Sequence, residues 1–122
     1  MPETPFRAYI DEGMEITGDI RARNPVRIDG KIKGNVYSSS DVIIGIKGSV
    51  EGKVFGKELI ISGRVKGKVL ARERVNLEAS ARLEAEIITP ILSIKDGAII
   101  RGGARVLPKP EVEKEIDREW KS

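Results

Sequence analysis

The sequence predicts an all-β, single-domain parallel β-helix, a solenoid of about six three-stranded coils. Three observations predict this fold: an aliphatic triplet that recurs every 16 to 18 residues, a pair of aliphatic residues four apart inside each repeat, and glycine at the breaks between them. The triplets begin at residues 8, 26, 42, 59, 75 and 92, so one unit fills most of the chain. A unit this short cannot bury its apolar residues alone, and stacked copies that share one core form a solenoid.

The triplets are predicted to form the first strand of each coil. In an extended chain alternate side chains share a face, so the first and third residues of each triplet are expected to point into the core. The triplets are Ala8-Tyr9-Ile10, Val26-Arg27-Ile28, Val42-Ile43-Ile44, Leu59-Ile60-Ile61, Val75-Asn76-Leu77 and Leu92-Ser93-Ile94.

The aliphatic pairs are predicted to form the two other strands of each coil. The gap between a triplet and the pair that follows alternates between six and four residues. Even gaps keep the side chains on one face of an extended chain, whereas helical spacing fits the repeats poorly. Glycine at the breaks suits tight corners, where φ can be positive. The pairs are Ile16/Ile20, Ile32/Val36, Val50/Val54, Val65/Val69 and Leu83/Ile87.

Composition argues against several function classes. The chain has no cysteine and no histidine, which removes thiolate chemistry and the commonest general base and metal ligand, so we expect no enzyme, no catalytic residue, no metal and no cofactor. The 22 basic and 19 acidic residues are interleaved, and only Tyr37 and Phe55 are aromatic within the central repeats. Nucleic-acid binding needs a basic stripe with stacking aromatics, so no nucleic-acid partner is expected. Since no enzyme is expected, no small-molecule substrate is expected either.

The chain divides into three segments by composition. Residues 1–7 are predicted to be a flexible N-terminal segment, residues 8–106 the β-helix, and residues 107–122 a charged C-terminal tail. Val112, Ile116 and Trp120 are spaced four apart, as in a short amphipathic helix, but at this length the sequence favours a solvated tail. No apolar run reaches the roughly 20 residues that span a bilayer, and residues 1–7 lack a signal-peptide core, so we expect a cytoplasmic protein.

The ends of the predicted rod are the candidate functional surfaces. Each end presents unpaired backbone groups and open aliphatic core, and exposed strand edges template further pairing. Neither terminal segment looks like a good cap, so end-to-end self-assembly into filaments is predicted. The predicted interface residues are Ile10, Ile16, Ile20, Ile99, Ile100, Arg105 and Val106.

Arg105 interrupts a column of small residues. The column lies two residues after each pair, is expected to point inward, and would continue at or near Arg105 in the last coil, where Gly103 replaces the expected aliphatic residue. An inward guanidinium is expensive to bury unpaired, so Arg105 would weaken or block contact at the C-terminal end. The alternative is that Arg105 reaches solvent. The earlier members of the column are Ala22, Ser38, Gly56, Ala71 and Thr89.

The amino-acid sequence of the repeats resembles that of the bactofilins, which are polymer-forming bacterial cytoskeletal proteins. The resemblance lies in VRIDGKIKGNV (26–36) and in residues 59–100, above all in the phrase ITPILSIKDGA with Thr89-Pro90. It implies a right-handed helix and nucleotide-independent assembly into nonpolar filaments through end-to-end contact. It also implies recruitment, in many members, to the inner face of the membrane through a short N-terminal motif, for which Met1, Phe6 and Arg7 are the candidate contacts.

Two other functions are compatible with a β-helix. A left-handed hexapeptide-repeat acyltransferase would need an aliphatic residue every six positions and usually a histidine base; here the gaps are two, four or six, and histidine is absent. A binding module for anionic polymers or lipids would use a stacked basic face, and steeply salt-dependent binding would support it. Its candidate residues are Lys31, Lys33, Lys53, Lys66 and Lys68.

Overall fold

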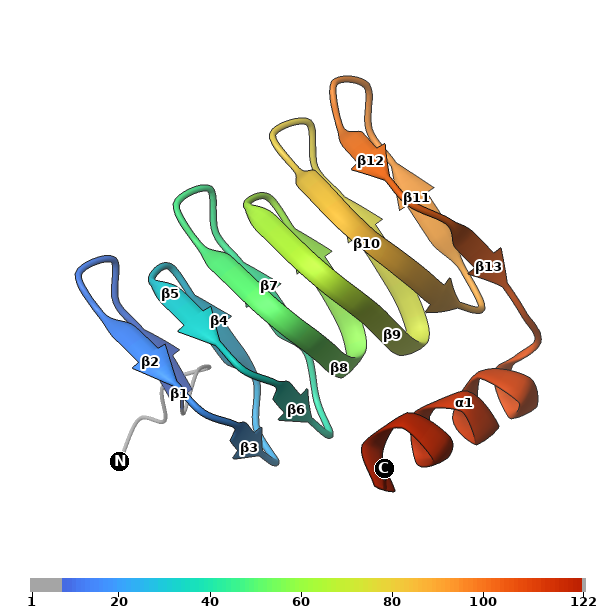
Figure 1. Ribbon diagram of the computed structural model, residues 1–122. Coiled ribbons are helices and arrows are strands. Elements are labelled where there is room, and N and C mark those ends of the chain that lie inside the picture. Colours follow the sequence, from blue (N-terminus) through green and yellow to red (C-terminus); the bar gives the residue numbers. More distant parts are fainter. Residues whose placement is uncertain (1–7, 122) are drawn as a thin grey trace, which may run out of the picture.

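The structure, a computed structural model, describes residues 8–121 as a β-solenoid with a helix along one side (Figure 1). All of the strand pairings are parallel, as the sequence predicts. The strands are β1 (Ala8–Ile10), β2 (Glu15–Thr17), β3 (Ile20–Ala22), β4 (Val26–Ile28), β5 (Lys31–Lys33), β6 (Val36–Ser38), β7 (Val42–Ile44), β8 (Ser49–Ile61), β9 (Arg64–Leu77), β10 (Arg82–Thr89), β11 (Leu92–Ile94), β12 (Ile99–Arg101) and β13 (Ala104–Val106), and the helix is α1 (Lys109–Lys121).

Six coils stack with the predicted triplets in register. Coils 1 to 6 begin at residues 8, 26, 42, 59, 75 and 92, and the triplets lie above one another on what we call the first face. In coils 3 and 4 the strands continue around the corners, so that β8 and β9 are 13 and 14 residues long. The predicted fold class and repeat positions are therefore confirmed.

The aliphatic pairs form the ladders of the second and third faces. The second face consists of β2, β5, the starts of β8, β9 and β10, and β12; the third consists of β3, β6, later parts of the same long strands, and β13. The inward ladder of the second face is Ile16, Ile32, Val50, Val65, Leu83 and Ile100. The inward ladder of the third face is Ile20, Val36, Val54, Val69, Ile87 and Ala104.

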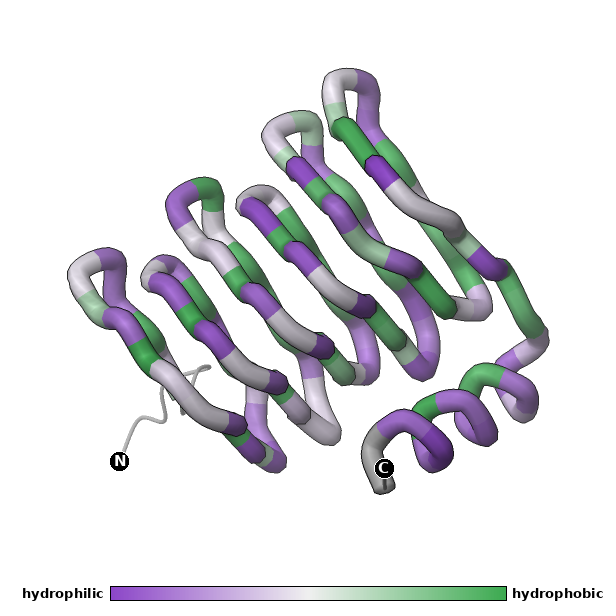
Figure 2. The backbone as a smooth tube through the Cα atoms, in the orientation of Figure 1, coloured by the Kyte–Doolittle hydropathy of each residue, from purple (hydrophilic) through white to green (hydrophobic). Residues whose placement is uncertain are grey.

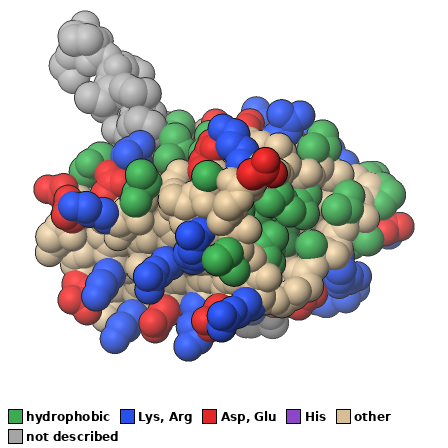
Figure 3. Space-filling model, turned by 90° about the horizontal axis from the view of Figure 1, so that it is seen from above, with side chains coloured by type: hydrophobic (Ala, Val, Ile, Leu, Met, Phe, Trp, Pro, Cys, Tyr) green, Lys and Arg blue, Asp and Glu red, His purple; other side chains and the backbone are tan. Residues whose placement is uncertain are grey.

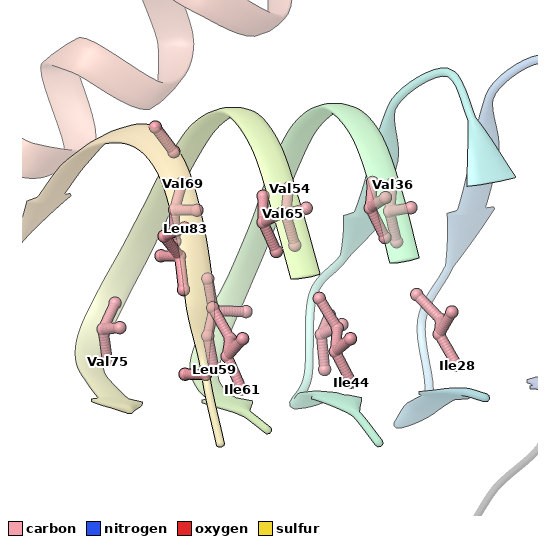
Figure 4. Close-up of a cluster of buried hydrophobic side chains, with 14 of the residues drawn as sticks. Ile28, Val36, Ile44, Val54, Leu59, Ile61, Val65, Val69, Val75 and Leu83 are labelled. Atoms are coloured by element: carbon pink, nitrogen blue, oxygen red, sulfur yellow. The ribbon is translucent and has the colours of Figure 1, made fainter. Parts of the chain in front are cut away.

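The core is an aliphatic column that runs along the solenoid axis (Figure 4). Val26, Val42, Leu59 and Val75 are completely buried. Since burying one such side chain stabilises the fold by about 1.5–3 kcal/mol, several per coil hold neighbouring coils together. Both buried polar side chains of the core have a hydrogen-bond partner: the Ser38 hydroxyl donates to the Asn24 carbonyl of the preceding coil (2.9 Å), and Thr89 Oγ1 donates to the nearby Ile91 carbonyl (3.0 Å).

A column of stacked glycines forms the corner between the second and third faces. Gly34, Gly52 and Gly67 all have positive φ angles, 149° at Gly52. A Cβ atom at Gly52 would lie 2.0 Å from the carbonyl oxygen of Gly34, and one at Gly67 would lie 2.1 Å from that of Gly52. Both the backbone angle and the close approach of successive coils therefore require glycine here.

The C-terminal segment is helical, where the sequence favours a solvated tail. α1 lies along the third face and contacts β9 and β10 (Figure 1). Its Val112 and Ile116 side chains are buried against Phe55, Leu70 and Ile88. An isolated helix of 13 residues is marginal in water, so this tertiary contact is the reason that the segment is helical. The side chain of Trp120, the third residue of the predicted stripe, lies outside the described residues.

Candidate functional site

The C-terminal end of the solenoid exposes core residues. Ile94 of coil 6 continues the inward column that includes Ile28, Ile44, Ile61 and Leu77. Ile94 is 49% exposed, whereas these four residues are at most 1% exposed. Val106, on the same coil, is 58% exposed. Because α1 covers a side and not this end, the described residues leave an apolar surface rimmed by the free edges of β11, β12 and β13 (Figure 1).

The N-terminal end is less open than the C-terminal end. Ile16 and Ile20 of coil 1 are half-buried, and Ile10 is only 5% exposed. The free edges of β1, β2 and β3 nevertheless have no neighbouring strand among the described residues. Both ends therefore offer strand edges, and the C-terminal end offers more exposed apolar surface.

A polar cluster joins coil 1 to coil 2 beside the N-terminal end. Arg27 Nε donates to Asp29 Oδ2 (2.9 Å), and the Tyr9 hydroxyl donates to the same oxygen (2.8 Å). Burial raises the pKa of Asp29, but the hydrogen bonds from Arg27 and Tyr9 outweigh it and hold that pKa below its ordinary value. The ionised carboxylate thus anchors the first coil, which has a neighbour on one side only.

The predicted interface residues all lie on end coils, but they differ in direction. Ile10, Ile16, Ile20 and Ile100 point inward as expected. Ile99 is paired with Arg82 in an outward column and is 47% exposed. The part that these residues play in assembly stays a prediction, and the predicted membrane contacts (Met1, Phe6 and Arg7) lie outside the described residues.

The predicted inward orientation of Arg105 is wrong. Arg105 pairs with Ile88 in an outward column, and Val106, not Arg105, follows Thr89 in the column of small residues. The repeat pattern predicts Gly103 at the second position of the last aliphatic pair. In the structure this pair is Ile100 and Ala104, so the register is shifted by one residue. The Arg105 guanidinium is half-exposed and lies near Glu86 (3.9 Å) and Glu115 (3.7 Å). No cost of burying an unpaired charge therefore arises at the C-terminal end.

The second face has two outward columns, and one of them alternates in charge. The alternating column reads Thr17, Lys33, Glu51, Lys66, Glu84 and Arg101, and the other reads Glu15, Lys31, Ser49, Arg64, Arg82 and Ile99. Opposite charges on neighbouring strands attract, which stabilises the first of these columns, whereas Arg64 and Arg82 lie side by side in the second. The lysines of the predicted anion-binding face are split, because Lys53 and Lys68 lie on the third face and pair with Glu119. Figure 3 likewise shows basic and acidic side chains interspersed on the side in view.

Residues 8–121 offer neither a metal site nor a membrane-spanning helix. No group of three or more acidic side chains there is arranged to hold a metal ion. No helix within that range has the length and apolarity needed to cross a bilayer.

Comparison with known proteins identifies the family of this solenoid. The sequence model of the Bactofilin family, described as polymer-forming cytoskeletal, matches residues 8–105. The chain belongs to the bactofilin family. The resemblance in its repeats is thereby confirmed, as is the expected class of polymer-forming cytoskeletal protein, and the acyltransferase alternative is not favoured.

Two curated bactofilins and one solved bactofilin structure are similar to this chain. Bactofilin BacO of Myxococcus xanthus (strain DK1622) is 29% identical over 93 residues, 76% of this chain and 74% of BacO. Bactofilin BacP of the same organism is 32% identical over 87 residues, 71% of this chain but only 36% of BacP. A cryo-EM reconstruction of Thermus thermophilus bactofilin double helical filaments matches with a TM-score of 0.77 and 32% identity, covering 80% of this chain and 97% of that one.

One feature of this bactofilin was missed by sequence reasoning. The outward column of the third face is apolar in four successive coils, and α1 covers it. The sequence contained a signal for this cover. The residue directly after the second member of each pair points outward, and a solvent-exposed position of this kind is expected to be polar. In coils 2 to 5 it is instead aromatic or aliphatic. The column is Arg21, Tyr37, Phe55, Leu70, Ile88 and Arg105. α1 follows the region that the family model matches, which ends at residue 105.

Proposed function

We propose that this bactofilin polymerises through its two end coils into filaments that act as a structural scaffold, without a nucleotide and without catalysis. The observation that carries the proposal is the exposure of Ile94, 49% on the last coil, in a column whose members in coils 2 to 5 are almost completely buried. A second copy stacked on coil 6 would give Ile94 the neighbour that every earlier member of its column has.

Apolar burial and edge pairing both contribute to such a contact. Covering the half-exposed Ile94 and Val106 side chains is worth on the order of 1 kcal/mol each, about half of full burial. Association of two proteins costs roughly 4–15 kcal/mol in lost freedom of motion, so these two residues are not sufficient. The backbone groups on the free edges of β11, β12 and β13 supply the remaining attraction when they pair with strands of a second copy.

One outward column counts against head-to-tail contact. If coil 6 of one copy continued into coil 1 of the next in the internal register, Arg105 would lie beside Arg21, about 4.8 Å away along the column. Like charges directly opposite one another on neighbouring strands are destabilising. The proposed contacts therefore join C-terminal ends to C-terminal ends and N-terminal ends to N-terminal ends, which gives a nonpolar filament.

An Ile94→Arg change tests the proposal. A cation at the open end of the core should prevent stacking, so filaments seen by electron microscopy of the unaltered chain should shorten to dimers or disappear. The solenoid should remain folded because Ile94 is at an end. Ile46→Arg is the matched control, since Ile46 is 73% exposed on a side corner. Filaments of normal length from the Ile94→Arg variant would contradict assembly through this end.

Membrane attachment is a separate part of the proposal. Met1, Phe6 and Arg7 combine apolar and basic character, and a filament multiplies weak anchors by presenting many copies at once. We therefore expect a cytoplasmic filament that also binds the inner face of the membrane. Filaments should co-sediment with anionic vesicles, and a Phe6→Glu variant should not; equal binding by both would contradict this attachment.

A further inference from the structure

The third face of the solenoid is a docking surface for a helix. We define this docking surface by its four apolar outward residues, Tyr37, Phe55, Leu70 and Ile88. α1 is its occupant within the chain. We propose that α1 also docks on the third face of a second copy, so that two copies joined at their C-terminal coils exchange helices. This inference rests on the end-to-end contact proposed above.

The docking surface depends on α1 for its cover. Phe55, Leu70 and Ile88 point away from the solenoid core yet are at most 1% exposed. Val112 and Ile116 of α1 fill the space above them and are 0% and 2% exposed. Removing α1 would expose this apolar stripe to water, so an occupant is energetically required.

The charges around the docking surface select a helix with carboxylates at the positions of Glu113 and Glu119. Glu119 pairs with Lys53 Nζ (2.8 Å) and with Lys68, and Glu113 Oε1 lies 3.9 Å from Arg72 Nε. The stripe is thus bordered by cations, and α1 supplies the carboxylates. A second third face would bring cations against cations, whereas the α1 of any other copy carries the matching charges. The occupant from outside the chain that fits best is therefore another α1.

The connection between coil 6 and α1 is short and favours an extended path. Only Leu107 and Pro108 separate β13 from α1. A residue that precedes proline is disfavoured in helical conformation, which applies to Leu107, and α1 begins directly after Pro108. Short hinges of this kind promote exchange of an element between copies, because the exchanged contact is the same as the original one.

The direction of α1 fits exchange across a junction of two C-terminal ends. In its own chain α1 starts beside coil 6 and reaches Lys68 of coil 4 and Lys53 of coil 3 (Figure 1). A two-fold axis at such a junction orients the coils of the second copy in the order 6, 5, 4, 3 away from the junction. A helix that crosses the junction therefore meets them in the order of its own chain, whereas a head-to-tail neighbour would present coil 1 first.

Charge reversal in two full-length chains tests the exchange. One chain carries Glu119→Lys, and the other carries Lys53→Glu with Lys68→Glu. Each chain repels its own α1, but in a mixture both contacts are restored by exchange. Because the native chain has no cysteine, Glu113→Cys in the first chain and Arg72→Cys in the second provide unique sites for a short bis-maleimide cross-linker. A tag on one chain separates the products on a denaturing gel.

We expect a covalent heterodimer in the mixture, several-fold more abundant than from chains that carry the cysteines alone. A single chain with all of the substitutions restores the internal contact and should cross-link mainly within itself. Circular dichroism verifies that the solenoid strands persist. If the reversed chains fold poorly, the cysteine-only pair decides: heterodimer that increases with protein concentration supports exchange, and its absence overturns it. Filaments that form without any heterodimer would overturn the exchange alone, whereas heterodimer without filaments would count against the proposed polymerisation.

Discussion

The second and third faces of this bactofilin have the same backbone arrangement, but their outward side chains differ in polarity. Both consist of parallel strands with an aliphatic inward ladder, and both are stacked over six coils. Outward, the second face is polar and charged, with one column that alternates cations and anions at Lys33, Glu51 and Lys66, and α1 does not lie on it. The third face carries apolar residues at the corresponding positions, as at Phe55 and Leu70, and is covered by α1 (Figures 1 and 2).

This difference shows that inward and outward residues of the same repeat have separate roles. Inward residues determine that coils form and stack, because each must match the coil below and the coil above. Outward residues determine what covers the coil, because they face either water or another element. One repeat can therefore keep its fold while a whole face changes from a solvated surface to a binding surface. Substitutions on the inward side and on the outward side should therefore have separable effects.

The largest effect is expected from a charge in an inward ladder, here that of the second face. Val65→Glu places a carboxylate where the side chain is 1% exposed and flanked by Val50 and Leu83. Burying an unpaired charge costs far more than the stability of a small domain can offset, so the chain should unfold. Far-UV circular dichroism measures this, with Lys66→Gln on the outward side as the control. Native spectra from Val65→Glu would contradict the inward assignment of this ladder.

A smaller effect is expected from an outward change on the third face. Leu70→Asn removes a completely buried side chain from beneath α1 and should weaken docking by about 2–5 kcal/mol while the coils stay folded. Limited proteolysis should then cleave within residues 107–121 several-fold faster. The equivalent outward change on the second face, Glu84→Asn, should leave that cleavage rate unchanged. Equal rates for all three proteins would mean that the two faces do not differ as described.

The smallest effect is expected from acid. Hydrogen bonds from Lys53 and Lys68 hold the pKa of Glu119 below its ordinary value of 4.5. A carboxyl whose pKa is lowered on docking stabilises the docked state above that ordinary value and loses this contribution as pH falls through the lowered pKa. Hydrogen exchange of the α1 amides should therefore show progressively weaker protection as the pH falls below 4.5, corrected for intrinsic rates. A Glu119→Gln variant should lack this part of the pH dependence; an unchanged dependence would assign it to other carboxylates.

Sequence reasoning succeeded where the physics is repetitive. The starts at Val26, Val42 and Leu59 could be predicted because stacking forces the same residue type into the same place in every coil. Arg105 was misplaced because coil 6 has a coil on one side only, and a register shift of one residue there, between Gly103 and Ala104, reverses the direction of the side chain.

The helix was missed for a different physical reason. Its stability comes from Phe55, Leu70 and Ile88, residues far away in the sequence, and not from its own propensity. Residues 107–122 taken alone are a charged segment with two prolines, which does not predict a stable helix. The cover could have been inferred only from the apolar residues that stand in outward positions on the third face.

The corner glycines restrict how this rod can change its length. Gly34, Gly52 and Gly67 each touch the carbonyl of the corner beneath too closely for any side chain, and only coil 5, with Ala85, has another residue at this corner. An insertion beside such a glycine would move a bulkier neighbour into that spot, whereas the other corners absorb single residues: coils of 16, 17 and 18 residues stack in one register, and the pairing of β8 with β9 shifts between Gly56 and Glu58 and then resumes. The rod can therefore gain length only by whole turns of 16 to 18 residues, each adding one strand spacing.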